Sequence, residues 1–406
     1  MAKGFEENLD QLAALCVRFG LNIQPDQELI LTAPIEAADL VNRITAEAYK
    51  AGARHVLPLF ADDAAVLARF EHGADDVFDY APKWLYEALG QALKGGAARL
   101  AIAGNTPGLL AGQDADKVAR SARAQSVAYR PFLDAITSGA TNWNIIPFVT
   151  PGWAAQVFPD LAPQDAIAKL WDLIFKATRL DQPDPVAAWE ENFATLTHRL
   201  NHLQGLNLSA LHFQGGGTDL TLGLAKGHKW AGGGMTLENG TRYAPNLPTE
   251  EIFTMPDKNR ADGRAVFTKP AVISGSIVEG LVVTFQGGKA VKIEATKGQD
   301  IAQSHFTTDE GASRLGEVAL VAQTSPIAQS GVLYYNTLFD ENAASHIAFG
   351  NSYAMNLMPG ADRTQAGANE SQIHMDCMIG SDQISVTGIG QDGSRHPVME
   401  NGEFLI

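Results

Sequence analysis

Two spacings of hydrophobic residues divide the chain. As far as residue 204, stretches with apolar residues every three or four positions alternate with short, continuous apolar runs. The stretches predict amphipathic helices and the runs predict buried strands. We expect helices at 5–19, 37–51, 61–70, 82–93, 165–178 and 185–203, and strands at 27–32, 54–59, 99–103 and 144–149. Strands separated by helices of this length indicate βαβ units, so residues 1–204 predict an α/β domain with a mainly parallel sheet.

The pattern changes near residue 205, beyond which glycine-rich turns separate short alternating runs. The clearest case is a pair of runs at 282–285 and 290–293 that flank Gly287-Gly288, a typical hairpin signal. Further strands are expected at 210–213, 220–222 and 384–387 and in the closing segment 401–406. Residues 205–406 therefore predict a β-rich α+β domain.

One helix is expected to interrupt this β-rich part. Thr307 and Glu310 have the spacing of a capping box, and apolar positions follow from Leu315. Glu317 would then lie in this helix among apolar neighbours. Burying a carboxylate there costs several kcal/mol unless a cation compensates, and an i,i+3 pair with Arg314 is the alternative.

Composition and charge exclude some classes of protein. Hydrophobic residues make up 45% of the chain and charged residues 19%, which is typical of a globular protein. The net charge is −16 and no cluster of Lys or Arg occurs, which argues against binding of nucleic acid. The first residues lack the apolar core of a secretion signal, and no apolar run is long enough to cross a bilayer. We therefore expect a cytoplasmic protein without a membrane partner.

The two cysteines, Cys16 and Cys377, both lie in apolar periodic segments. Such positions favour two buried thiols over a disulfide, particularly in the cytoplasm.

The run His374-Met375-Asp376 carries the first candidate ligands of a metal ion. Residues two apart in a strand face the same side, so His374 and Asp376 would converge while Met375 packs inward. An imidazole and a carboxylate arranged in this way suit Zn, Co or Mn. A surface ion pair between the two residues is the alternative.

His346 and Tyr353 lie on either side of the turn Gly350-Asn351-Ser352. His346 stands among small and apolar residues, where it is either a hydrogen-bonded core histidine or a ligand. The phenol of Tyr353 is either part of an ordinary core or a group that binds a metal or stabilises a developing oxyanion.

Glu250 and Glu251 are adjacent carboxylates that follow Pro248. Two neighbouring carboxylates can divide their roles, with one binding a metal and the other moving protons. The alternative is that both are first-turn acids of a helix, which Pro256 would keep very short.

The glycine-rich segment 215–219 is not expected to bind phosphate. It lacks the Gly-Lys-Ser/Thr of a P-loop and the strand–GxGxxG–helix context of a dinucleotide site, so we interpret it as a turn between strands. Serine-based hydrolysis is not indicated either, because the chain has no Gly-x-Ser-x-Gly motif.

In order and spacing, the segments that carry these candidates resemble the signature segments of the thermophilic (M29) metallo-aminopeptidases, the aminopeptidase T group. The segments are 246–254, 314–317, 346–353 and 374–380, and 217–220 also fits. The resemblance covers essentially the whole chain. One departure is Cys377, which stands where a larger apolar residue is expected.

The resemblance implies a cytoplasmic homodimer that releases N-terminal residues from peptides with the help of two divalent ions, Co, Zn or Mg. Carried over residue by residue, the metal ligands would be Glu251, Glu317, His346, Tyr353, His374 and Asp376. The acid that follows the Pro-Thr pair in the family falls at the second position here, which favours Glu251 as the ligand. Glu250 is then the candidate general base, and Tyr353 is a candidate catalytic group as well as a ligand.

The expected mechanism follows from this ligand set. Two metals would lower the pKa of a bridging water and polarise the scissile carbonyl, while a carboxylate that binds no metal takes up the proton. A non-catalytic peptide-binding protein of the same fold is the main alternative. A nucleotide-using α/β enzyme is disfavoured because no glycine fingerprint is present.

Overall fold

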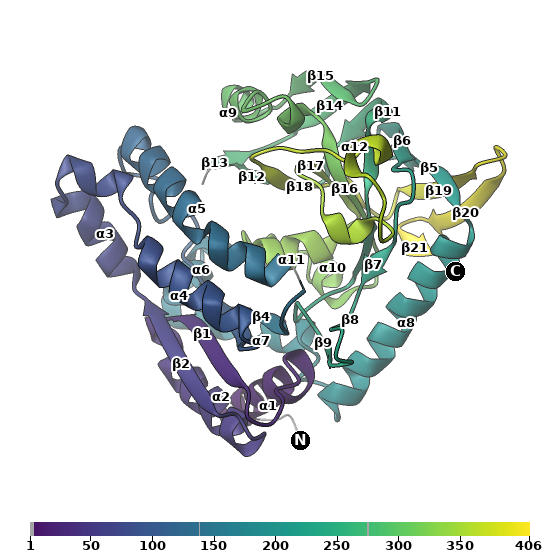
Figure 1. Ribbon diagram of the computed structural model, residues 1–406. Coiled ribbons are helices and arrows are strands. Elements are labelled where there is room, and N and C mark those ends of the chain that lie inside the picture. The colour runs from purple at the N-terminus through teal and green to yellow at the C-terminus, as the bar shows by residue number, and fades with distance from the viewer. Residues whose placement is uncertain (1–3, 138, 274–275) are drawn as a thin grey trace. The chain divides into compact units, whose positions relative to one another are not determined.

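The computed structural model describes residues 4–137, 139–273 and 276–406. The chain separates into two compact units, each built from two stretches of sequence. The first unit contains the chain up to Glu190 together with Gly234–Pro248, and the second contains Glu191–Gly233 together with Thr249–Ile406. Figure 1 shows the helices and strands of both units, coloured along the chain.

These units differ from the expected ranges 1–204 and 205–406 at two places. Helix α8, Pro185–Gly205, continues through residue 190, so the division falls within a helix. Residues 234–248 return to the first unit because their backbone pairs there: the N–H of Ile145 donates to the carbonyl of Pro245 at 2.8 Å. Contacts between residues far apart in the sequence therefore set this boundary.

The first unit is built around a parallel sheet. Its strands are β1 Glu28–Pro34, β2 His55–Ala61, β3 Ala98–Ala103 and β4 Trp143–Pro147, in the order β2-β1-β3-β4, and a separate pair is formed by β8 Met235–Thr236 and β9 Arg242–Tyr243. Its helices are α1 Phe5–Leu15, α2 Ala38–Lys50, α3 Asp63–His72, α4 Lys83–Lys94, α5 Ala115–Thr137, α6 Pro151–Val157 and α7 Pro163–Ala177, and α8 begins here. The pairs β1–β2, β1–β3 and β3–β4 are all parallel, which confirms the expected α/β fold.

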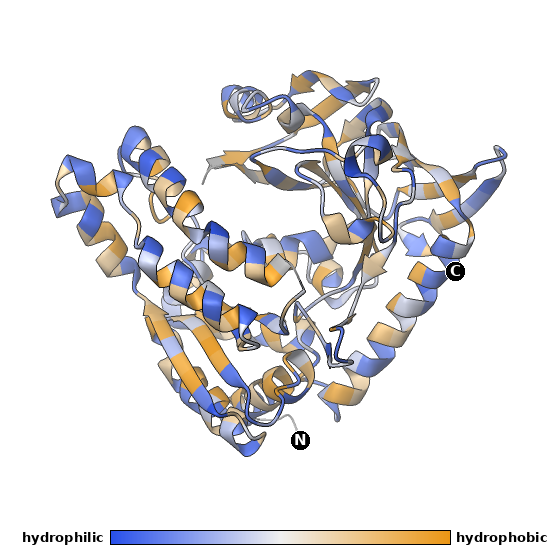
Figure 2. Cartoon of the chain, viewed as in Figure 1, coloured by the Kyte–Doolittle hydropathy of each residue, from blue (hydrophilic) through white to orange (hydrophobic). Residues whose placement is uncertain are grey.

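Hydropathy explains these elements. In Figure 2 strands β1 and β2 are mainly hydrophobic, whereas helices α3, α4 and α5 carry both colours, as helices with one buried face do. The sequence pattern missed α5, which contains Pro131. A proline lacks the N–H of a regular helix, but Phe132 of α5 packs with Leu89 and Leu93 of α4 in a common core.

The second unit is rich in strands, as expected. One sheet has the order β18-β17-β16-β10-β7, a second has the order β15-β14-β11-β6-β5-β19-β20-β21, and β12 and β13 form a separate pair. The strands are β5 Leu208–Gly215, β6 Thr218–Leu224, β7 Ala231–Gly232, β10 Glu251–Thr254, β11 Pro256–Val266, β12 Ala271–Ile273, β13 Ser276–Val278, β14 Val282–Gln286, β15 Lys289–Glu294, β16 Leu315–Val321, β17 His346–Gly350, β18 His374–Met378, β19 Ser385–Gly390, β20 Arg395–Glu400 and β21 Glu403–Phe404. The helices are α9 Gln299–His305, α10 Pro326–Ser330, α11 Thr337–Asp340 and α12 Arg363–Ala366.

The five-stranded sheet has one face in the core of this unit. Phe349 of β17 stacks on Phe285 of β14 with 5.6 Å between the ring centroids, and it meets Phe306 edge-on at 4.4 Å. Since side chains alternate along a strand, His346 and Ala348 of β17 face the opposite side. The packing of Phe349 therefore directs His346 away from this aromatic core.

The expected helix around Glu317 is wrong. Residues Leu315–Val321 form strand β16, and only a 3-10 turn at Gly311–Ser313 precedes it. All seven residues of β16 are buried, and the strand pairs with β17 on one side and β10 on the other, so two ladders of hydrogen bonds outweigh the local helix signal. The alternative pair with Arg314 is also absent from the described contacts, because this guanidinium donates to the carbonyl of Lys258 at 2.9 Å.

Other local predictions are confirmed. Strands β14 and β15 form the expected hairpin, and both glycines of its turn have positive φ, 56° for Gly287 and 79° for Gly288. Segment 215–217 connects the paired strands β5 and β6, so it is a turn between strands. Cys16 and Cys377 are free and buried.

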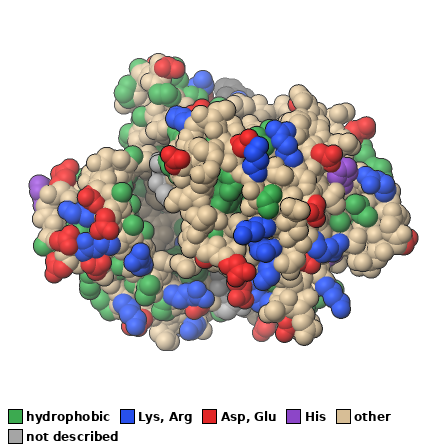
Figure 3. All heavy atoms as spheres, turned by 90° about the horizontal axis from the view of Figure 1, so that it is seen from above, with side chains coloured by type: hydrophobic (Ala, Val, Ile, Leu, Met, Phe, Trp, Pro, Cys, Tyr) green, Lys and Arg blue, Asp and Glu red, His purple; other side chains and the backbone are tan. Residues whose placement is uncertain are grey.

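Charged side chains of both signs lie on one face of the molecule. On the face drawn in Figure 3, acidic and basic side chains are interspersed. The net charge of −16 is therefore not concentrated there. In the described part of the chain, no helix combines the length and hydrophobicity that crossing a membrane requires.

Candidate metal centre

The five-stranded sheet brings several predicted ligands onto one face. They are Glu251 of β10, Glu317 of β16, His346 of β17, and His374 and Asp376 of β18. The register explains this: Ala348 of β17 pairs with Glu317 on one side and with Asp376 on the other. Paired residues share a face of the sheet, and so do residues two apart in one strand. His346 therefore lies on the same face as Ala348, and His374 lies on the same face as Asp376.

The ligand atoms form two groups of three. One contains Glu251, Glu317 and His346, the other contains Glu317, His374 and Asp376, and the atoms of each group lie within 4.8 Å of one another. Nε2 of His346 lies 3.4 Å from Oε2 of Glu251 and 3.7 Å from Oε1 of Glu317. Nε2 of His374 lies 3.4 Å from Oδ1 of Asp376 and 4.0 Å from Oε2 of Glu317. Glu317 therefore offers one oxygen to each group.

Backbone carbonyls orient both imidazoles. Nδ1 of His346 lies 3.1 Å from the carbonyl of Ala344, and Nδ1 of His374 lies 2.8 Å from the carbonyl of Asn351. A carbonyl only accepts hydrogen bonds, so each Nδ1 carries the proton and each Nε2 of a neutral ring presents a lone pair to the carboxylates. Second partners of this kind are typical of histidines that bind metals.

This arrangement fits a divalent cation. Lone pairs of imidazole and carboxylate repel one another unless a proton or a cation lies between them. Oε2 of Glu251 is buried and accepts no hydrogen bond from any described residue, which leaves it available to a metal. Mixed nitrogen and oxygen donors suit Zn and Co, and carboxylates also suit Mg.

Without a cation, these groups must share protons. Burial raises the pKa of Glu251 to about 8, although His346 opposes the shift. Burial alone would lower the pKa of His346, but the carboxylates of Glu317, Glu251 and Asp376 raise it to about 10. His374 follows the same pattern, with burial opposed mainly by Asp376, and its pKa rises to about 9. Divalent cations would take the place of the protons that otherwise neutralise the carboxylates of this centre.

Tyr353 borders the centre beside His374. Their ring centroids are 4.7 Å apart, and the tyrosine is 38% exposed. Burial of the phenol and the nearby acids, Glu317 first among them, raise its pKa, so the hydroxyl keeps its proton in the metal-free protein. The side chain of His346 is only 1% exposed and that of His374 is 21% exposed. The centre is therefore open on the side of His374 and Tyr353.

Glu250 belongs to neither ligand group. Its N–H donates to Oδ1 of Asn342 at 2.6 Å, and its negative charge acts on Arg199, whose pKa is lowered mainly by burial. Adjacent residues of an extended chain face opposite sides, so the carboxylate of Glu250 is directed away when that of Glu251 faces the centre. Of the two neighbouring acids, Glu251 therefore lies in a ligand group and Glu250 does not.

Glu341 is a carboxylate beside the centre that the sequence pattern did not single out. It lies in the 3-10 turn Glu341–Ala343, shortly before β17. Burial raises its pKa well above the usual range, and the nearby acids Glu251 and Asp376 raise it further. The only sequence signal was an acidic pair, Asp340-Glu341, shortly before a buried strand with a histidine.

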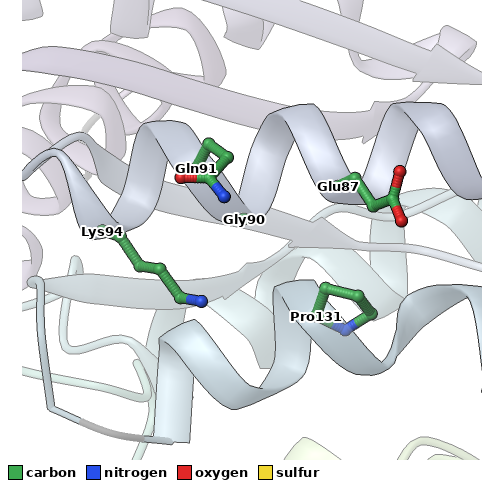
Figure 4. A pocket seen from close by; sticks show the side chains of 5 residues that line it. All are labelled: Glu87, Gly90, Gln91, Lys94 and Pro131. Carbon is green, nitrogen blue, oxygen red and sulfur yellow. The ribbon is translucent and has the colours of Figure 1, made fainter.

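A groove in the first unit has different chemistry. It has a volume of about 340 Å³ and lies between α4 and α5 (Figure 4). Its lining residues are Glu87, Gly90, Gln91, Lys94 and Pro131. One acid and one lysine do not make a metal site, so the groove does not compete with the centre on the five-stranded sheet.

Comparison with known proteins places the chain among metalloproteases. The family model for the thermophilic metalloprotease (M29) matches residues 5–404. Aminopeptidase T from Thermus aquaticus is 48% identical over 405 residues, which covers 99% of both chains, and Aminopeptidase T from Thermus thermophilus is 45% identical over the same shares. The solved structure "Wild-type AmpT from Thermus thermophilus" superposes with a TM-score of 0.96 at 44% identity, covering 99% of this chain and 100% of that one.

The fold and the site define a protein with the ligand types of a metal-dependent hydrolase. This chain belongs to the thermophilic metalloprotease (M29) family. The expected family resemblance is confirmed.

Proposed function

We propose that this protein is a metal-dependent aminopeptidase that releases N-terminal residues from peptides at a centre for two divalent ions. The relatives named above are aminopeptidases of the same family. The observation that carries the count of two is the position of Glu317, whose Oε1 faces His346 and whose Oε2 faces His374. One carboxylate shared by two ligand groups is what a pair of neighbouring cations requires.

We assign one cation to each ligand group. Glu251, Glu317 and His346 would hold the first, and Glu317, His374 and Asp376 the second. When bound, Zn, Co or Mg would lower the pKa of a water and polarise the scissile carbonyl. The two histidines hold their rings in place through the carbonyls of Ala344 and Asn351.

Glu341 is our candidate for the general base, in place of the expected Glu250. It is a half-buried carboxylate whose pKa is raised by burial, by Glu251 of the first group and by Asp376 of the second, and it is a member of neither group. A carboxylate in that position can take a proton from the attacking water and pass it to the leaving amine. Glu250 belongs to neither group, and its place next to Glu251 in an extended chain directs its carboxylate to the opposite side.

Tyr353 is our candidate for stabilising the carbonyl oxygen of the substrate. Its side chain lies on the open side of the centre, in contact with the ring of His374. A protonated phenol there can donate a hydrogen bond to the oxygen on which negative charge develops. Its further role as a metal ligand rests on the family resemblance.

The test is release of an amino acid from an amino-acid p-nitroanilide, first after exhaustive chelation and then after Zn or Co is added back. We expect no turnover without metal and recovery with it. Glu251→Gln should bind fewer ions than the wild type. Full activity in the chelated protein would contradict the proposal, whereas peptide binding without product would favour the non-catalytic alternative.

The general base is tested by comparing Glu341→Gln with Glu250→Gln. Glutamine keeps the shape of each side chain and removes its basicity. We expect Glu341→Gln to lower kcat by about 10²- to 10⁴-fold while metal content is retained. Glu250→Gln should cause a clearly smaller loss. Loss of metal from Glu341→Gln would instead identify this residue as a ligand.

We also propose that the enzyme is a cytoplasmic homodimer, as its family resemblance implies. Large apolar side chains exposed on the first unit, such as Trp84 at 67% and Val127 at 69%, support an association between copies. Light scattering coupled to size exclusion should give twice the monomer mass of 43.3 kDa.

A further inference from the structure

We propose that Asn369 is a positioning residue that sets the metal affinity of the centre. Its buried side chain would do this by fixing the backbone next to Glu317 and His374, without touching metal or substrate. The inference rests on the proposed function and deepens it.

The side chain of Asn369 connects two segments, the turn 311–314 and the end of β17. It is 1% exposed, and its Nδ2 donates to the carbonyls of Gly311 at 2.9 Å, Arg314 at 3.1 Å and Gly350 at 2.7 Å. An amide has two N–H bonds, so three acceptors share two protons. Each accepting carbonyl is therefore held toward one small group.

The backbone of Asn369 holds Ser352, two residues beyond Gly350 in the same segment. Its carbonyl accepts from the N–H of Ser352 at 3.1 Å and from Oγ of Ser352 at 2.8 Å. Ser352 lies between Asn351, whose carbonyl orients the ring of His374, and Tyr353, whose ring contacts His374. A shift of Ser352 would thus move both groups that contact this histidine.

The same contacts lead to Glu317. Arg314 directly precedes β16, which carries Glu317, and its carbonyl also accepts from the N–H of Gly350 at 2.9 Å. Gly350 is in turn the register partner of His374. The side-chain amide of Asn369 therefore joins the start of β16 to the end of β17. At this end, β17 pairs with β16, which bears Glu317, and with β18, which bears His374.

Close backbone packing leaves little room for these segments to adjust. A Cβ atom on Gly316, the residue before Glu317, would lie 2.3 Å from the carbonyl oxygen of Gly350 and 2.6 Å from that of Asn351. A Cβ on Gly311 would lie 2.0 Å from the carbonyl oxygen of Glu370. Because backbone meets backbone at these points, movement of one segment displaces its neighbours.

Removal of the amide has a defined consequence. Asn369→Ala removes the buried amide that ties the turn 311–314 to Gly350, so the two segments lose their shared donor and are free to shift apart. Glu317 and His374 would then lose the arrangement that serves the shared ligand groups. Partners that orient metal ligands typically change metal affinity by about ten- to 100-fold, and we expect a loss of this size.

The experiment measures metal binding by the apoprotein, which does not depend on turnover. Zn affinity is measured by competition with a chromophoric chelator for the wild type, Asn369→Ala and Asn142→Ala. Asn142 is a matched control in the first unit: it is fully buried, and its Nδ2 donates to the carbonyl of Leu21 at 2.6 Å. We expect both variants to lose thermal stability, but only Asn369→Ala to bind Zn about ten- to 100-fold more weakly.

The absorption spectrum of the Co-loaded protein gives a second readout, because its bands report ligand geometry. We expect altered bands for Asn369→Ala and wild-type bands for Asn142→Ala. Unchanged Zn affinity together with an unchanged Co spectrum in Asn369→Ala would overturn the proposal. If the wild type itself bound no metal, the proposed function would fail instead, so the two failures are distinguishable.

Ser352→Ala is the milder variant if Asn369→Ala does not fold. It removes only the hydroxyl that donates to the carbonyl of Asn369 and leaves the three amide contacts in place. We expect a smaller loss of Zn affinity in the same direction and a change in the Co bands. Wild-type values for both measurements would then overturn the proposal.

Discussion

Glu317 and Asp376 are register partners of the same residue, Ala348, so the two carboxylates stand on either side of one alanine. Cβ atoms of paired residues in neighbouring strands are about 4.5–5.5 Å apart. The small side chain of Ala348 therefore lies in the space between the two acids, on the face that carries both ligand groups.

Ala348→Leu should fill this space. Ala348 is fully buried, so the larger side chain should cost about 1–3 kcal/mol of stability and also exclude metal. Metal content by atomic absorption and the midpoint of urea unfolding measure the two effects. Ala265→Leu is the control, since Ala265 of β11 is equally buried in the other sheet; it should be destabilised but should keep its metal. Normal metal content in Ala348→Leu would place the centre elsewhere.

His374→Ala should abolish turnover while the fold is kept. The substitution removes one nitrogen donor from the second ligand group. Loss of a residue that only orients a ligand lowers metal affinity or activity by up to about 100-fold, and loss of a ligand should lower activity further. Anilide hydrolysis and circular dichroism measure activity and folding. His212→Ala is the control, because His212 pairs with Asp219 at 2.7 Å, outside both ligand groups. Undiminished activity of His374→Ala would disprove the ligand assignment.

Tyr353→Phe separates the two roles predicted for this phenol. Phenylalanine keeps the ring that lies 4.7 Å from the ring of His374 and removes only the hydroxyl. If the hydroxyl stabilises the developing oxyanion, kcat should fall by about 10²- to 10³-fold with metal content retained. Loss of one metal equivalent would show that the phenol is a ligand. Tyr80→Phe, at a site that is 60% exposed in the first unit, should behave as the wild type.

The metal-free protein should become less stable as the pH rises. The folded-state pKa is raised to about 8 for Glu251, about 10 for His346 and about 9 for His374, so the folded state binds more protons than the unfolded one. Their contribution is complete below the unfolded pKa and is lost as the pH passes the folded one. The loss of stability begins near the ordinary pKa of each group, which is 4.5 for Glu251 and 6.5 for the two histidines. The pKa of Asp376 is lowered from its ordinary value of 3.8, so its stabilising effect is lost only when the pH falls below about 3.8.

Thermal unfolding between about pH 5 and 9 tests this, once with a chelator and once with Zn. The melting temperature should fall with pH in the chelator and fall less with Zn, because metal binding requires deprotonated ligands. At a free Zn concentration of 100 Kd, the metal should add about 2.7 kcal/mol. Glu251→Gln should flatten the profile of the chelated protein. A melting temperature that rises with pH in the chelator would contradict the shifts.

Local patterns in the chain predicted much of the local structure and most of the residues that the structure brings into the two groups. Glycine pairs such as Gly287-Gly288 fix a turn through their own backbone freedom, and the alternation of a strand directs His374 and Asp376 to one side. Both effects depend only on near neighbours in the chain, so a single sequence records them. The order and spacing of the ligand segments then sufficed to predict the family.

How these pieces meet depends on contacts between residues far apart in the chain. Glu317 lies in a strand and not in a helix because β10 and β17 pair with both of its edges. Glu341 and Asn369 acquire their positions from contacts with residues far away in the chain, which no local pattern encodes. Propensity and periodicity are short-range and weak, whereas burial and strand pairing across tens of residues supply most of the free energy that chooses among local alternatives.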